Sequence, residues 1–224
     1  DILINTGESP YVIEDEKLVF TAEGWKSRWG GVMEFDRRTK LIVPQTGDAG
    51  CLGTGWRDYR AQELSPGKVR LIKQFTRKPA VGNYLVLRHS ARDHSGAFIT
   101  DSRNVTISGM NMYHCAGLGI LSQYSENLTF RKVNCIPDAS KNRIFSGHDD
   151  GMHFSNCRGR ILIDSCSFLA LMDDPINVHG TSVMIVEKKD EKTVVCKFMH
   201  PQSIGFIWAR TGERISFVEN ESMT

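Results

Sequence analysis

The amino-acid sequence predicts an all-β protein, a right-handed parallel β-helix with inserted small antiparallel β-barrel segments. The first observation behind this prediction is that residues 149–154 and 173–178 can be laid over each other in constant register. Each stretch opens with two aspartates and continues with alternating apolar and polar residues. A repeat of about 20–30 residues with one short strand per copy is typical of solenoid proteins. The second observation is that no repeat contains an amphipathic helical segment, which disfavours a solenoid built from helices.

Two strand types recur along the chain. The copies of the first type are residues 105–107, 128–130 and 161–163, and a second pair of inward-facing residues follows each copy. The interval between its second and third copies is longer than the interval between its first and second. The copies of the second type are residues 97–99, 118–120, 152–154 and 176–178. Asn104, Asn127 and Gly159 are expected at tight corners between strands, because small and amide side chains tolerate such turns.

Changes in composition and strand pattern divide the chain into four segments. Residues 1–24 are expected to form lead-in β-helix strands, and residues 25–86, rich in Gly, Arg and Trp, a β-barrel-like insertion. Residues 87–182 are expected to form the parallel β-helix core that carries the aspartates. Residues 183–224 read as the start of a second antiparallel β insertion, which is truncated.

Two further local predictions concern loops and the C-terminal strands. The longer repeat holds an extra loop at residues 137–147, which is expected to overhang the aspartates. After the repeats end, residues 183–186, 193–198 and 214–218 alternate as strands do and predict an antiparallel meander.

Composition excludes several functional classes. The chain has 224 residues, of which 24% are charged and 40% apolar, as in ordinary globular proteins. The net charge is +2, and without a cluster of Lys and Arg no nucleic-acid partner is expected. The longest apolar runs, such as residues 168–172, are too short to span a membrane. No signal peptide is visible at residues 1–5.

The six cysteines form no CxxC pair and no zinc-ligand spacing with histidine. Cys135, Cys157 and Cys166 fall in or next to the repeated strands. They are therefore predicted to be free thiols stacked inside the solenoid.

The constant register of the two doublets predicts a patch of four carboxylates, because equivalent positions on successive turns stack about 4.8 Å apart. The patch consists of Asp149, Asp150, Asp173 and Asp174. Like charges at that distance repel, so a fold tolerates them where a ligand, a metal or chemistry uses them. Strand alternation alone would bury Asp150 and Asp174, and an unpaired buried carboxylate is costly. The backbone is therefore expected to bend at Gly151 and Pro175 and to turn both doublets toward solvent.

Three interpretations of this patch remain open. The first is that the aspartates only form turns, in which aspartate is common. The second is a Ca²⁺ site, because Ca²⁺ binds clusters of oxygen atoms. Glycoside hydrolysis is the third, because it needs one protonated carboxyl and one ionised carboxylate. Crowding would raise the proton affinity of one member and so supply the acid. Residues His153, Asn177 and His179 are expected to line the same groove as sugar contacts.

Residues 147–154 together with residues 171–180 resemble glycoside hydrolase family 110. These are bacterial α-1,3-galactosidases that remove terminal galactose from blood group B and related glycans. The resemblance runs through most of the chain and is densest at residues 104–180. It implies a parallel β-helix with β-barrel insertions, an inverting mechanism, and no metal or cofactor.

The resemblance also implies roles for individual residues. Asp173 would be the general acid, with Asp150 and Asp174 as bases for the attacking water and Asp149 in support. Besides the three groove residues, His148 is expected to contact substrate. Family members are much longer than this chain, so the isolated chain need not be active.

Two alternatives stay open. One is a polygalacturonase-like β-helix hydrolase, which residues 148–150 and 179–180 weakly resemble. The Asn-Thr-Asp and Arg-Ile-Lys elements of such hydrolases are absent from this chain. The other is a non-catalytic or truncated glycan-binding β-helix. The expected partner is an oligosaccharide or glycoconjugate, and pairing through the flat side of the β-helix as a homodimer is a further expectation. The expected location is the periplasm or the exterior of a bacterium.

Overall fold

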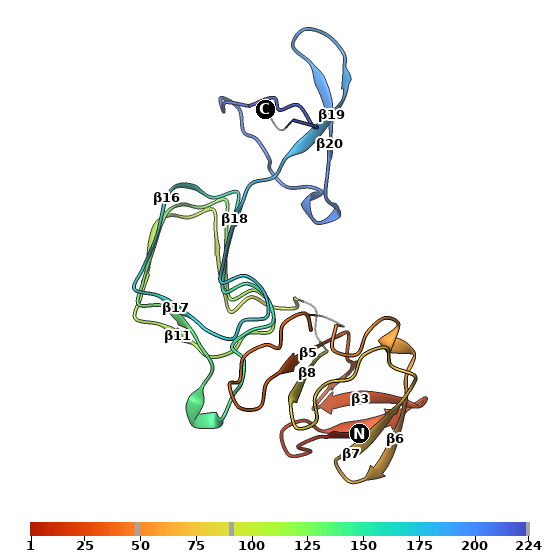
Figure 1. The fold of residues 1–224 in the computed structure, drawn as a ribbon. Helices are drawn as coiled ribbons and strands as arrows, with labels where there is room; N and C mark the ends of the chain where they lie inside the picture. The colour runs from red at the N-terminus through yellow and green to blue at the C-terminus, as the bar shows by residue number, and fades with distance from the viewer. Residues whose placement is uncertain (48–49, 90–91, 223–224) are drawn as a thin grey trace.

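A computed structural model describes residues 1–47, 50–89 and 92–222. Within these residues the protein is all-β, with strands, three short 3₁₀ turns and no α-helix, so the coarse prediction of fold class is confirmed. The sheets are partly parallel and partly antiparallel. Figure 1 shows antiparallel sheets near the N-terminus, a stack of squared turns in the middle of the chain, and a hairpin near the C-terminus. None of the helical turns in the described part of the chain is long and apolar enough to cross a membrane.

The N-terminal strands form three antiparallel sheets, β2-β3-β4, β1-β7-β6 and β5-β8. Their bounds are β1 Ile2–Leu3, β2 Tyr11–Glu14, β3 Lys17–Ala22, β4 Trp25–Arg28, β5 Gly31–Phe35, β6 Arg60–Ser65, β7 Lys68–Ile72 and β8 Tyr84–Arg88, with a 3₁₀ turn η1 at Trp56–Asp58. In the buried core, Trp29 and Trp56 stack with ring centroids 4.3 Å apart. The indole Nε1 of Trp29 donates a hydrogen bond of 2.7 Å to the Tyr59 hydroxyl. Leu18 and Phe20 pack into the same cluster, so strand β3, which begins within residues 1–24, is part of this core.

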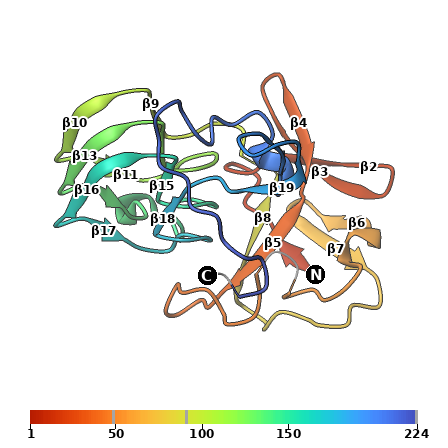
Figure 2. The ribbon, with the colours of Figure 1, turned by 90° about the horizontal axis from the view of Figure 1, so that it is seen from above.

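The middle of the chain forms three parallel sheets, β10-β13-β16, β11-β14-β17 and β18-β15-β12-β9. Their bounds are β9 Ala97–Thr100, β10 Arg103–Ser108, β11 Asn111–Met112, β12 Ile120–Gln123, β13 Glu126–Arg131, β14 Asn134–Cys135, β15 Met152–Ser155, β16 Arg158–Asp164, β17 Ser167–Phe168 and β18 Ile176–His179. Each successive turn of the chain adds one strand to each sheet, until β18 begins a fourth turn. Figure 2 shows β10, β13 and β16 side by side. The first predicted strand type is therefore confirmed, because Val105 pairs with Leu128 and Leu128 pairs with Ile161.

The corners between these strands follow the prediction. Asn104, Asn127 and Gly159 have φ angles of 55°, 56° and 64°, in the left-handed region that glycine and asparagine tolerate best. The side-chain amide of Asn127 donates to the Asn104 side-chain oxygen at 3.3 Å, and its own oxygen accepts the Arg160 backbone N–H at 3.0 Å. An amide can therefore link one corner to the corners on both sides of it.

The second predicted strand type was partly wrong. In the structure Ile120 pairs with Ala97 and Met152, so the predicted copy at residues 118–120 was placed two residues too early. The strand begins only after a tight corner at Gly119, where a Cβ would lie 2.3 Å from the Gly151 carbonyl oxygen. Gly119 and Gly151 directly precede the paired residues Ile120 and Met152, so they occupy equivalent corners.

The loop at residues 137–147 does not overhang the aspartates, and that prediction was wrong. It contains the 3₁₀ turn η2, Ala139–Lys141, and packs against the N-terminal part of the chain. Ile144 and Phe145 pack with the buried Met33 and Phe35. The apolar side chains bury there, which draws the loop away from the aspartates.

The C-terminal segment contains the antiparallel hairpin of β19, Val183–Lys188, and β20, Val194–Phe198, followed by η3, Pro201–Ser203. These strands confirm two of the three predicted there. Residues 214–218 are described but form no strand, so the third was wrong. Phe217 and Val218 are 72% and 53% exposed, because no described strand lies beside them to pair with.

All six cysteines are free thiols, which agrees with the prediction for Cys135, Cys157 and Cys166. Cys115 and Cys135 are buried in the core of the parallel stack. Cys157 and Cys166 are partly buried and pack against that core. Burial raises the pKa of Cys135 to about 11, which makes it an inert apolar side chain.

Candidate functional site

The two aspartate doublets are brought together by the register of adjacent turns. Gly147 bridges to Leu171 before the doublets, and Met152 pairs with Ile176 after them, both in the register that the repeat predicted. Between these points the Gly151 backbone N–H donates to the Asp174 carbonyl at 2.9 Å. The chain therefore stays stacked through the site, and each aspartate of the first doublet has a counterpart on the next turn.

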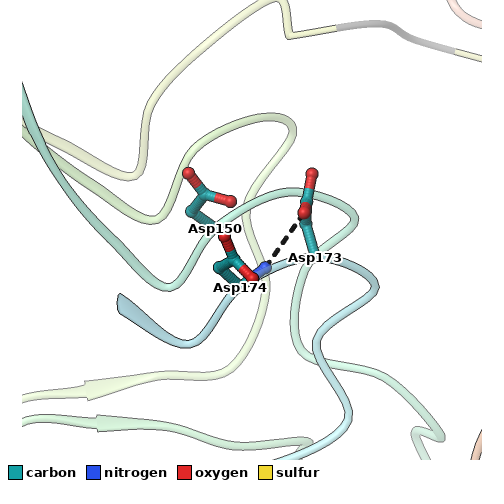
Figure 3. Close-up of side chains that lie close together, drawn as sticks. All are labelled: Asp150, Asp173 and Asp174. Carbon is teal, nitrogen blue, oxygen red and sulfur yellow. Dashed lines mark hydrogen bonds between the residues drawn. The ribbon is translucent and has the colours of Figure 1, made fainter. Parts of the chain in front are cut away.

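Three of the four carboxylates converge. One oxygen from each of Asp150, Asp173 and Asp174 lies within 4.8 Å of the other two. Figure 3 shows these three side chains close together. The Asp174 backbone N–H donates to Asp173 Oδ1 at 3.1 Å, which fixes the Asp173 side chain. Among the His, Cys, Asp and Glu side chains of the described residues, this is the only group with three ligand atoms close enough together for a metal ion.

Asp149 lies apart from that group and is buried. It is 4% exposed, and its Oδ1 accepts from Arg92 Nε at 3.0 Å. The His148 Nδ1 lies 3.1 Å from its other oxygen. Burial by itself would raise the pKa of Asp149, but the adjacent His148 and Arg92 outweigh it and lower that pKa below its ordinary value. Asp149 is therefore an ionised structural anchor beside the cluster.

The expectation that both doublets face solvent was wrong for the first one. Asp150 is only 2% exposed, whereas Asp173 and Asp174 are exposed. The bend at Gly151 does not turn Asp150 outward, because the next turn lies too close. A Cβ on Gly151 would lie 2.8 Å from the Pro175 carbonyl oxygen. Burial is tolerated because Asp150 Oδ2 has a partner, His153 Nδ1, at 2.6 Å.

Asp173 has the electrostatic environment of an acid. Burial raises its pKa first, and the negative charges of Asp150 and Asp174 raise it further. The Asp174 backbone N–H and the Arg92 guanidinium, whose Nη2 lies 3.7 Å from Asp173 Oδ2, act in the opposite direction but do not cancel the rise. Asp173 therefore keeps its proton to a higher pH than an ordinary aspartate.

The cluster opens into a hollow of about 580 Å³, large enough for a small sugar. Of the residues predicted to contact substrate, three line this hollow: His153, Asn177 and His179. His148 does not, because it is 7% exposed and its Nε2 lies 3.3 Å from the Ala116 carbonyl oxygen. It acts on Asp149 from inside the fold.

Several lining residues were not found from the sequence. Arg92 contacts two of the aspartates, but it lies before the first repeated strand and has no counterpart in the repeats. A second part of the lining comes from the segment after β20. Its members are Met199, His200, Gln202, Ser203 and Phe206. Nothing in the local sequence pattern of that segment indicates that it faces the aspartates.

Known protein families match both ends of the chain. Residues 1–85 match the GLAA-B beta-barrel domain I family, and residues 193–224 match GLAA-B beta-barrel domain II. The chain is 47% identical over 227 residues to a protein named alpha-1,3-galactosidase B from Bacteroides thetaiotaomicron, an alignment covering 100% of this chain and 36% of that protein. It is 37% identical over 219 residues to alpha-1,3-galactosidase A from Bacteroides fragilis, covering 96% of this chain and 35% of that protein. The corresponding figures for alpha-1,3-galactosidase B from Akkermansia muciniphila are 30% over 226 residues, 100% and 28%.

The chain belongs to the α-1,3-galactosidase family. This confirms the resemblance drawn from the two aspartate stretches. The chain spans about a third of the length of the family members that it matches. The alignment with the Bacteroides thetaiotaomicron α-1,3-galactosidase covers the whole chain, so it includes the stacked turns that carry the aspartates as well as the two barrel domains.

Proposed function

We propose that this chain carries the active site of a glycosidase that releases terminal α-1,3-linked galactose from glycans with inversion. The observation that supports this most is the raised pKa of Asp173 beside two further carboxylates at the floor of a hollow. A protonated and an ionised carboxyl side by side are what glycoside hydrolysis requires. The names of the similar proteins support the choice of linkage and sugar.

In the proposed reaction, Asp173 donates its proton to the glycosidic oxygen as the bond from that oxygen to the sugar C1 breaks. Asp150 and Asp174 are the bases. One of them takes a proton from a water molecule whose oxygen forms the new bond to C1. Asp173 suits the acid role because it is accessible at the rim and its pKa is raised. Asp149 holds Arg92 beside Asp173 and takes no proton.

The inverting course is the part of the proposal that rests on the family resemblance. Inverting enzymes hold their two carboxyl groups about 6.5–9.5 Å apart, and retaining enzymes about 5–5.5 Å apart. The 4.8 Å limit here applies to one oxygen of each carboxylate and not to the carboxyl centres, so it does not choose between the two courses. The anomer that the protein releases first therefore distinguishes inversion from retention.

We also propose an architecture for these parts. The three parallel sheets are the faces of a right-handed parallel β-helix, and each turn of the chain adds one strand to each face. The matches to barrel families support reading the antiparallel parts before and after it as barrel insertions. A glycan substrate supports a location in the periplasm or outside the cell.

A second candidate function is cation-dependent glycan binding without catalysis. It is favoured by one observation, the all-oxygen cluster of three carboxylates, because Ca²⁺ prefers oxygen ligands. Galactose release from Galα1-3Gal, measured before and after treatment with a chelator, separates the two. Release that survives chelation supports the hydrolase, and binding that is lost with no release at any stage supports the alternative.

A further inference from the structure

A chain of hydrogen bonds runs from Asp150 to the edge of the hollow. His153 Nδ1 lies 2.6 Å from Asp150 Oδ2, and His153 Nε2 lies 2.8 Å from His179 Nε2. His179 Nδ1 lies 3.0 Å from the Gly180 carbonyl oxygen. The two rings meet edge to face at an angle of 80°. They come from β15 and β18, which pair directly, so the register that joins the doublets also joins the histidines.

The atoms at the two ends of this chain decide which ring nitrogen carries hydrogen. The Gly180 carbonyl can only accept, so His179 Nδ1 must donate to it. The hydrogen between the two Nε2 atoms and the hydrogen between His153 Nδ1 and Asp150 Oδ2 can each lie on either partner. His179 Nδ1 carries its hydrogen in every arrangement that satisfies all three bonds.

We propose that His153 and His179 are positioning residues that orient Asp150 for its role as a base, an inference that rests on the proposed function. Asp150 Oδ2 is occupied by His153, which leaves Oδ1 as the oxygen that can face water. Arg92 is a cation that faces these carboxylates.

The same two histidines were predicted as sugar contacts, and the structure argues for a different role. Both ring nitrogens of His153 are already bonded inside the protein, one to Asp150 and one to His179. Both ring nitrogens of His179 are bonded as well. Neither ring has a nitrogen left to bond a sugar hydroxyl while the chain is intact. Asn177 lines the same hollow and makes no side-chain hydrogen bond within the described chain, which leaves it better suited to contact substrate.

A nuclear magnetic resonance experiment tests the hydrogen-bond chain independently of activity. The ¹⁵N resonances of the seven histidines are recorded in this protein and assigned through His153→Gln and His179→Gln. The expected result is a protonated Nδ1 on His179 and a scalar coupling between the two Nε2 nuclei through the shared proton. A His179 ring protonated on Nε2 alone, or the absence of that coupling, overturns the proposal.

Kinetics of two matched variants test the positioning role in the full-length protein. His179→Gln keeps an amide that can accept from or donate to His153, whereas His179→Leu fills similar space with no polar atom. His179→Leu is expected to lower kcat about 10- to 100-fold with little change in KM, the scale of a misplaced catalytic group. His179→Gln is expected to restore kcat to within a few-fold of the unmodified protein. Equal rises in KM for both variants, with kcat unchanged, would assign His179 to sugar binding and overturn the proposal.

The two proposals fail in different ways. If the unmodified protein releases no galactose but shows the predicted tautomer and coupling, the hydrolase proposal fails. The hydrogen-bond chain is then present, but it positions no catalytic base. If galactose is released and the tautomer is wrong, only the positioning role fails. Should His179→Leu not fold, Asp150→Asn supplies the second measurement, because removing the carboxylate that anchors His153 is expected to abolish the coupling.

Discussion

The carboxylate of Asp173 lies within 4.8 Å of that of Asp150, although Asp150 is almost fully buried and the Asp173 side chain is 46% exposed. Two adjacent turns of the stack thus place one carboxylate at the floor of a hollow and another at its rim. The difference in exposure and in neighbouring groups supports the different roles proposed for the two carboxylates. Asp150 is held by His153, whereas the pKa of Asp173 is raised by its partial burial and then by its acidic neighbours.

Replacing the proposed acid gives the first prediction. Asp173→Asn is expected to lower galactose release from Galα1-3Gal about 10²- to 10⁴-fold, the usual contribution of a general acid. The melting temperature is expected to stay the same or rise, because the change removes repulsion from Asp150 and Asp174. Asp15→Asn is the matched control, since that side chain is 89% exposed in the N-terminal part of the chain. Full activity in Asp173→Asn would remove this residue from the acid role.

The pH dependence of the reaction gives the second prediction. An acid must be protonated to act, so kcat/KM is expected to fall as pH rises through the raised pKa of Asp173. Arg92 opposes that rise, and Arg92→Gln is therefore expected to move the alkaline limb to higher pH. The measurement is kcat/KM against pH for both proteins. An alkaline limb that moves to lower pH in Arg92→Gln contradicts the electrostatic account.

Stability at low pH gives the third prediction. The pKa of Asp149 is lower in the folded protein than in the unfolded chain, so its ionised form stabilises the fold. This contribution is fully present above the unfolded pKa of about 3.9 and is lost as pH falls through the folded pKa. Asp149→Asn is expected to cost about 1.5–3 kcal/mol at pH 7, the range for hydrogen bonds to charged groups. Urea unfolding at pH 7 and pH 3 checks this, and a cost that is no smaller at pH 3 would rule out the ionised carboxylate as its source.

Packing at the site gives the fourth prediction. Gly151→Ala is expected to destabilise the protein by about 1–3 kcal/mol, because the new Cβ would lie 2.8 Å from the Pro175 carbonyl oxygen. The turns that carry Asp150 and Asp174 would be pushed apart, so activity is expected to fall as well. Gly30→Ala is the control, since its Cβ would meet nothing within 4 Å. Equal stability of the two variants would show that the turns can separate freely.

Much of the stacked part of the fold could be predicted because its pattern is local. The alignment of the two aspartate stretches fixes the pairing of Met152 with Ile176, and the corner residues Asn104 and Asn127 need left-handed backbone that few residues tolerate. Those signals lie within a few residues of the structure that they determine. From them all four aspartates were predicted to gather, and Asp150, Asp173 and Asp174 do converge, whereas Asp149 lies apart.

What could not be predicted depends on contacts between distant segments. Arg92 and His148 determine that Asp149 is a buried anchor, and nothing in the repeat identifies Arg92 as its partner. The loop at residues 137–147 was misplaced for the same reason, because Phe145 packs on the N-terminal part of the chain. The misplaced copy at residues 118–120 has a different origin, since the glycine corner gives no apolar signal to fix the register.

The anomer of galactose released first is the measurement that tests the proposed mechanism most directly. Galα1-3Gal is mixed with the longest natural form of the protein, and the anomeric protons are followed by NMR before mutarotation. Attack of water on C1 opposite the leaving oxygen, assisted by Asp150 or Asp174, predicts β-galactose as the first product. Release of α-galactose first, or no release at all, would contradict the account.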